Sequence, residues 1–293
     1  MTSARPLQAA AFLLLAGGVW LTGSGLEARV QAPYDVSVVP RASLLRWLSF
    51  GHPTLAANLF WLRTVQFVGE PRAKERGFGK LYPLVDLVTD LDPGHGYAYQ
   101  VGGVLLGSLG QVAESNAILE KGIRNTPNRY ILPYLRAFNA FYYQDDWPEA
   151  GRWAAVSART PGAPPHVFQN VTAYYVKGRR ADAAVAFLEQ SLAEARDPET
   201  RKAVEKQLQQ ARLEREALRL EDAAAAWRER YLAGPLSLGQ LVEEGLVPVL
   251  PADPYGGELV LDAEGKVRST AHDFRFQPPT PFSQRRPEPG VGR

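Results

Sequence analysis

The chain has 293 residues, which is enough for one or two domains with a sizeable core. Its formal net charge is +2, so the composition indicates no polyanionic partner such as a nucleic acid. It has no cysteine, which excludes disulfides, thiolate metal sites and a lipid-modified N-terminal cysteine.

An apolar segment begins shortly after Arg5. Residues 7–26 carry no charged side chain, and about 20 apolar residues suffice to cross a bilayer. The positive N-terminal flank favours an orientation that places the rest of the chain outside the cytoplasm. We therefore expect residues 1–29 to form an uncleaved signal anchor in the inner membrane, with a single pass and a periplasmic body. The alternative is a cleavable signal peptide, because Gly23-Ser24-Gly25 supplies small residues suited to cleavage.

After a linker at residues 30–41, we expect a diverged N-terminal helical repeat at residues 42–95. Gly51-His52-Pro53 divides its apolar first part, because Pro53 disfavours a helical His52 and cannot donate a backbone hydrogen bond. Two helices are predicted, at residues 42–50 and 54–68, and neither is long enough to span a membrane. They either pack on the repeats that follow or lie against a membrane surface.

Three repeats are predicted at residues 96–195. Pro93, Pro127 and Pro161 stand 34 residues apart, which is the period of the tetratricopeptide repeat (TPR). Each copy places large and small residues in the order of that repeat: Tyr99, Gly103, Leu106, Ser115 and Leu119; then Tyr134, Ala137, Phe141 and Ala150; then Tyr174, Gly178, Ala183 and Phe187. The second copy departs from the pattern at Phe138, where glycine is usual, and the period contains one-residue slips. The pattern predicts an all-α fold, a TPR-like α-solenoid of helical hairpins.

A long capping helix is predicted at residues 196–234. Asp197-Pro198-Glu199 is a favourable start, with a cap, proline at the first position and an acid near the positive end of the helix dipole. Apolar residues recur at steps of four and three: Leu213, Ala217, Leu220, Ala224, Trp227 and Tyr231. The helix closes the end of the solenoid or, alternatively, pairs in a coiled-coil dimer.

The C-terminal part changes character. Residues 235–276 predict a short helix and a β-hairpin, with strands at 258–262 and 266–270 after the turn-rich segment Asp253-Pro254-Tyr255-Gly256-Gly257. Residues 277–293 are rich in proline, and we expect them to be a disordered tail.

The chain resembles a group of bacterial membrane-anchored TPR proteins associated with the cell envelope and pili. The matching residues are Leu48-Ser49-Phe50-Gly51, Asn58-Leu59-Phe60-Trp61-Leu62-Arg63, Leu91-Asp92-Pro93 and Leu250-Pro251-Ala252-Asp253-Pro254-Tyr255-Gly256-Gly257. The last stretch is also similar to the Asp-Pro-aromatic-Gly segment of type II secretion pseudopilins. The resemblance implies a setting in envelope assembly, such as a type IV pilus or a secretion machine, and it carries over no catalytic residue.

Enzyme motifs are absent from the sequence. There is no GxxxxGK[ST], GxGxxG or GxSxG, and none of the four histidines has a second ligand at metal spacing. Asp86 and Asp90 share a helix face with Asp92 and His95 close behind, which allows a divalent-ion site, but a solvated helix end explains them as well. We expect no catalytic residue, no cofactor and no metal.

The function expected from these features is a non-enzymatic scaffold or adaptor anchored in the cell envelope. It would bind a partner protein or peptide in a concave groove, with no nucleic acid and no small-molecule substrate. One alternative is an envelope hydrolase with an unrecognised site. Another is a structural subunit that oligomerises through the helix at residues 198–233.

The groove is expected on the first helix of each repeat, at repeat positions two, five, nine and twelve or thirteen. The candidate partner-binding residues at these positions are Tyr97, Gln100, Asn139, Tyr142, Tyr143, Phe168 and Tyr175. The same positions also hold Val104, Leu132, Leu135, Thr172 and Val176. Tyrosine gives a large contact area with a polar tip, and Asn139 is suited to bind the backbone of an extended peptide. The alternative is that these aromatic residues pack against the N-terminal helices or the tail.

Overall fold

The computed structural model describes residues 38–70, 77–232, 234–235, 237–262, 264–273 and 275–276. The expected anchor at residues 1–29, most of the linker and the expected disordered tail at residues 277–293 lie outside these described residues. Within the described ranges, no helix is both long enough and apolar enough to cross a membrane.

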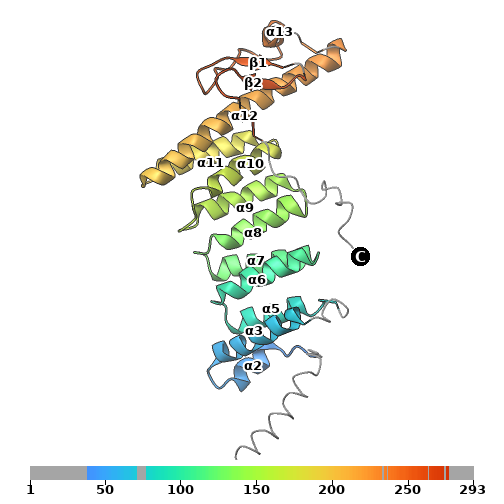
Figure 1. Ribbon diagram of the computed structural model, residues 1–293, viewed down its shortest axis with the longest axis vertical. Coiled ribbons are helices and arrows are strands. Elements are labelled where there is room, and N and C mark those ends of the chain that lie inside the picture. Colours follow the sequence, from blue (N-terminus) through green and yellow to red (C-terminus); the bar gives the residue numbers. More distant parts are fainter. Residues whose placement is uncertain are drawn as a thin grey trace, which may run out of the picture.

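The described chain is mostly helical, so the expectation of an all-α fold is confirmed. The helices are α2 (Ala42–Leu48), α3 (Pro53–Gly69), α5 (Leu81–Leu91), α6 (Gly96–Ser108), α7 (Val112–Asn125), α8 (Ile131–Tyr142), α9 (Trp147–Arg159), α10 (Val167–Lys177), α11 (Ala181–Glu194), α12 (Pro198–Tyr231) and α13 (Leu238–Glu243). Figure 1 shows them stacked in chain order, from α2 and α3 at one end to α12 at the other. Consecutive helices pack as hairpins, because the turns between them are short.

Small residues let the two helices of a hairpin approach closely. A Cβ atom added at Gly103 of α6 would lie 2.6 Å from the Leu119 side chain of α7, and one added at Gly122 of α7 would lie 2.6 Å from Tyr99. Ser115 also donates a hydrogen bond of 2.6 Å from its hydroxyl to the Gly103 carbonyl oxygen. Gly103 and Ser115, two small positions of the expected pattern, therefore lie where α6 and α7 cross, as does Gly122, which the pattern did not single out.

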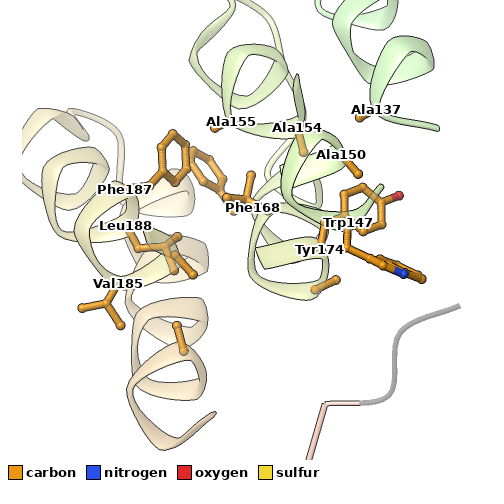
Figure 2. Packing of buried hydrophobic residues seen from close by; sticks show 14 of the residues in the cluster. Ala137, Trp147, Ala150, Ala154, Ala155, Phe168, Tyr174, Val185, Phe187 and Leu188 are labelled. Atoms are coloured by element: carbon orange, nitrogen blue, oxygen red, sulfur yellow. The ribbon is translucent and has the colours of Figure 1, made fainter. Parts of the chain in front are cut away.

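The central core joins α8, α9, α10 and α11. Phe141 of α8 stacks on Tyr174 of α10, with ring centroids 4.9 Å apart. Figure 2 shows Trp147 beside Tyr174, and Phe168 beside Phe187, with Ala150, Ala154 and Ala155 of α9 in the same cluster. Burial of the Tyr174 hydroxyl raises its pKa well above the ordinary value.

Helix α12 begins as its sequence predicts, since the Asp197 carboxylate accepts a hydrogen bond of 2.7 Å from the Thr200 backbone N–H. Its first half buries Val204 and Leu208 in the central core. Its second half packs on α13 and the β-hairpin through a separate cluster that includes Ala217 and Leu220. Most of its apolar face is therefore covered within one chain, although Tyr231 at its end is 44% exposed.

The β-hairpin is present but shorter than expected. β1 (Leu259–Leu261) and β2 (Val267–Ser269) pair antiparallel, with Leu259 opposite Ser269 and Leu261 opposite Val267. The preceding turn is organised by Asp253, whose buried carboxylate accepts hydrogen bonds from the Tyr255 and Gly257 backbone N–H groups and from the Ser269 hydroxyl. The Asp-Pro-Tyr-Gly-Gly segment is thus a structural turn that holds the hairpin.

Candidate partner-binding surface

The expected groove residues lie on α6, α8 and α10, the first helices of the three hairpins. On α6, Tyr97 is 56% exposed and Val104 is also exposed, while Gln100 is half-buried. Tyr97 does not project freely, because its ring meets Trp61 of α3 edge-on, at 6.0 Å between centroids. The N-terminal helices thus contact this end of the expected groove, as one of the two alternatives predicted.

Asn139 is a correction to the expected groove. Its side chain is only 4% exposed, and its amide donates to Ser115 Oγ at 2.7 Å and to Asn116 Oδ1 at 2.9 Å. Both partners belong to α7, so the amide joins α7 to α8 and does not face a groove.

Phe168 is a second correction, since it is 6% exposed and its ring lies 6.1 Å from that of Phe187 in α11. Leu132, Thr172 and Val176 are buried as well. The reason is geometric: each residue turns a helix by about 100°, so a one-residue slip in the repeat moves a position from the groove to a packing face. The expectation of an open wall was wrong at these positions.

Tyr142 and Tyr143 are half-buried at the end of α8, where they form an aromatic cluster with Phe138. Phe138 stacks on Tyr142 with centroids 4.8 Å apart, and Tyr143 meets Tyr142 almost perpendicularly at 4.9 Å. Burial, together with the neighbouring Tyr142, raises the pKa of Tyr143. Sequence reasoning did not assign Phe138 to the surface, although its departure from the usual glycine was the signal.

Tyr143 also packs close to the backbone of α6. A Cβ added at Gly107 would lie 3.3 Å from the Tyr143 ring and 3.3 Å from Asn139 Oδ1. The absence of a side chain at Gly107 therefore leaves room for the tyrosine at the junction of the first two hairpins.

Tyr175 of α10 lies over Gly151 of α9, where an added Cβ would be 2.5 Å from its ring. It lines a shallow hollow of about 380 Å³ whose other walls are mostly charged: Asp146, Pro148, Glu149, Arg152, Arg180 and Ala183. The stack of Phe141 on Tyr174 places the ends of α8 and α10 side by side. Tyr142 and Tyr175, the next residues in sequence, therefore lie at the same end of the two helices.

An ion-pair network adjoins this hollow. Glu149 accepts hydrogen bonds from Arg152 and from the Trp153 indole, and Arg136 approaches its Oε1 at 3.6 Å. The hydrogen bond from Arg152 lowers the pKa of Glu149 below its ordinary value, burial opposes the change, and the Trp153 bond adds to it. This carboxylate is held ionised and oriented.

Asp86 and Asp90, which the sequence suggested as ligands of a divalent ion, form ion pairs with a lysine. Lys121 Nζ lies 2.6 Å from Asp86 Oδ1 and 2.6 Å from Asp90 Oδ1. Burial lowers the pKa of Lys121, but the hydrogen bonds to both aspartates outweigh it, and the pKa lies above the ordinary value. The ammonium group thus occupies the space between the two carboxylates, and the described residues contain no cluster of three or more potential metal ligands.

A larger cavity of about 510 Å³ lies between α10, α12 and the C-terminal segment. Two of its carboxylates are already engaged: Glu214 and Glu221 both lie 3.0 Å from the Arg275 guanidinium. Glu214 is buried and also accepts a 2.6 Å hydrogen bond from the Phe276 backbone N–H. These contacts fasten the C-terminal segment to α12.

Comparison with known proteins returns no match: no protein-family model fits the chain, and no curated protein or solved structure is significantly similar to it.

Proposed function

We propose that this chain is a non-enzymatic adaptor of the bacterial cell envelope, a TPR-type solenoid that holds a partner protein or peptide. The observation that carries the proposal is a set of partly exposed aromatic side chains, hereafter the aromatic ledge: the cluster of Phe138, Tyr142 and Tyr143, together with Tyr175 on the next hairpin. These side chains come from two neighbouring hairpins and remain partly exposed. Large aromatic residues of this kind dominate the binding energy of protein interfaces.

The surroundings of the ledge suit a peptide better than a small apolar ligand. The hollow beside Tyr175 is shallow and carries both signs of charge, with Glu149 and Arg152 already paired. A partly buried aromatic centre with a polar rim is the usual composition of a protein–protein interface. A partner segment that places an apolar side chain on the ledge, with polar flanks, would match this arrangement.

The proposed location is the inner membrane, with the body in the periplasm. The support is the uncharged apolar segment at residues 7–26 and the positive flank before it. Together with the resemblance to envelope TPR proteins, this location points to a role in assembling a pilus or a secretion machine.

The alternatives receive less support. A hydrolase needs a nucleophile or base free to act, whereas Glu214 and Glu221 of the cavity between α10 and α12 are bound to Arg275. A structural subunit dimerising through α12 would have to uncover an apolar face that α13 and the hairpin already pack against.

Site-specific photo-crosslinking in cells tests the proposal. A photoreactive amino acid at Tyr142 should produce a discrete adduct with one partner protein, identifiable by mass spectrometry. The control is Lys202, which is exposed on α12 at the far end of the stack. A Tyr142 probe that yields no more adduct than the Lys202 probe would contradict capture at the ledge.

A further inference from the structure

One end of the helical stack exposes large apolar side chains. This end face consists of the outward residues of α2, α3 and the turn between them, among them Trp47, Leu48, Phe50, Leu55, Leu59 and Leu62. Trp47 is 75% exposed, Phe50 is 86% exposed, and α2 has no buried residue at all. An uncovered patch of this kind marks an interaction surface.

In each of the two helices, these exposed residues differ from the ones that pack on α5. Leu45 of α2 and Phe60 of α3 both pack into the cluster formed with α5. Leu55, Leu59 and Leu62 follow the spacing i, i+4 and i+7, so they form one stripe along α3. Figure 1 shows α2 and α3 at the end of the stack opposite α12.

The opposite end of the stack differs sharply in composition. The exposed side of α12 carries charged residues, with ion pairs such as Arg201–Glu205 and Arg212–Glu189. A polar outer face of this type is what terminal helices of a stacked array need in water. The end face lacks such a polar surface, so we expect something other than water to cover its apolar side chains.

Charge selects among the possible occupants. Residues 42–69 contain no aspartate or glutamate, while Arg41, Arg46 and Arg63 lie in or next to the two helices. Glu70, which directly follows α3, is outnumbered by these three arginines. Apolar residues flanked mostly by cationic ones are suited to the headgroup region of an anionic bilayer. A second copy related by a two-fold axis would instead bring arginines of like sign together.

The length of the preceding chain sets where this face can be. Val38, the first described residue, follows Leu26 by 12 positions, and a chain of that length reaches at most about 40 Å. If residues 7–26 reside in a membrane, as proposed above, the end face stays near that membrane. Helix α3 has 17 residues, or about 25 Å, which is shorter than the roughly 30 Å hydrocarbon core.

We propose that the end face lies in the interfacial layer of an anionic lipid bilayer, with α2 and α3 parallel to the membrane and the stack projecting from it. This inference rests on the proposed membrane location but not on capture of a partner at the aromatic ledge. It gives the adaptor a fixed orientation, with the β-hairpin at the end farthest from the lipid.

The absence of native cysteine allows a direct test on the full chain. A nitroxide label is attached to Leu59→Cys, and in a separate variant to Lys202→Cys as the exposed control on α12. Each protein is reconstituted into phosphatidylcholine vesicles with or without phosphatidylglycerol. Collision of the label with oxygen, which partitions into lipid, is compared with collision with a water-soluble nickel chelate by electron paramagnetic resonance.

With phosphatidylglycerol present, the Leu59 label should show several-fold more oxygen than nickel collision, and the Lys202 label should show the reverse. Adding Arg63→Glu should lower the ratio of oxygen to nickel collision at the Leu59 label by about fivefold or more, because each basic residue near an anionic surface contributes to binding. A label at Leu62→Cys, on the same stripe, should repeat the Leu59 result.

Three results would overturn the inference. The first is that the Leu59 label collides freely with nickel in both kinds of vesicle. The second is dipolar broadening between labels of two chains, which would assign the end face to self-association. The third is that nickel collision falls only when a cell extract is added, which would assign the end face to a protein partner. Carbonate extraction of cell membranes tests the proposed membrane location separately. A chain that stays in the membrane pellet supports that location even if the end face does not contact lipid. A chain that carbonate releases contradicts the location itself.

Discussion

The side-chain amide of Asn139 in α8 donates a 2.7 Å hydrogen bond to the hydroxyl of Ser115 in α7, and that hydroxyl donates to the Gly103 carbonyl oxygen in α6. Three successive helices are therefore linked by one buried polar chain. Such a chain stabilises the fold when every member is satisfied, and losing one member leaves the others buried without a partner.

Replacing Asn139 by Ala should therefore lower the free energy of unfolding by about 1–3 kcal/mol, because the buried Ser115 hydroxyl and the Asn116 side chain each lose one hydrogen bond. Urea denaturation followed by circular dichroism measures this. Gln100→Ala, at a half-buried position of α6, is the control and should change stability much less. If the Asn139→Ala protein instead keeps its stability but no longer captures the partner, Asn139 is a partner-binding residue.

Replacing both Tyr142 and Tyr143 by Ala should weaken partner capture and leave thermal stability nearly unchanged, since both rings are partly exposed on the ledge. Affinity purification from cells and a thermal melt measure the two effects. If the melting temperature falls by about 5 °C or more, the tyrosines serve the core and the ledge is not a binding surface.

The matched control for the ledge is Phe141, the residue next to Tyr142. Phe141→Ala should cost about 3–5 kcal/mol, because its ring is buried and stacks on Tyr174. Comparing the two variants distinguishes an aromatic residue that stabilises the core from aromatic residues that bind a partner, within a single turn of α8.

Glu149 should make stability depend on pH in the acidic range. Its pKa in the folded chain is lowered below 4.5 by the hydrogen bond from Arg152, so the folded state binds its proton less readily than the unfolded state. The stabilisation is present above pH 4.5 and is lost as the pH falls through the lowered pKa. Unfolding measured across this range should show a smaller acid-induced loss in Glu149→Gln, and an identical slope in both proteins would exclude this role.

The C-terminal segment should stay docked through Arg275. Arg275→Ala leaves Glu214 buried without its ionic partner, so we expect a loss of about 3–5 kcal/mol in the docking of the segment. In limited proteolysis, the parent chain should lose only the extreme C-terminus beyond residue 276, whereas the variant should also be cut between Gly234 and Gly257.

Arg268→Ala is the control for this experiment, because Arg268 pairs with Asp262 on the exposed side of the hairpin. Its cleavage pattern should match that of the parent chain. Rapid cleavage of the parent between Gly234 and Gly257 would show that the hairpin region is a loose appendage.

Much of the helical architecture could be read from local signals. Proline spacing and caps such as Asp197 place the helix ends, because these residues act on the backbone within a few positions of themselves. The β-hairpin was likewise predictable from turn residues and short strand patterns, although each strand is shorter than its pattern. The sequence by itself thus determined which segments are helical and in what order.

The surface was decided only by the tertiary structure. Asn139 and Phe168 occupy expected groove positions yet are buried, since a small shift in how helices pack rotates a residue from one neighbour to another. Lys121 meets Asp86 and Asp90 from more than 30 positions away, a contact that no local pattern specifies. The apolar residues of α2 and α3 resemble core residues in sequence, and the end of the stack leaves Trp47 and Leu59 uncovered because no further helix of the described chain packs there.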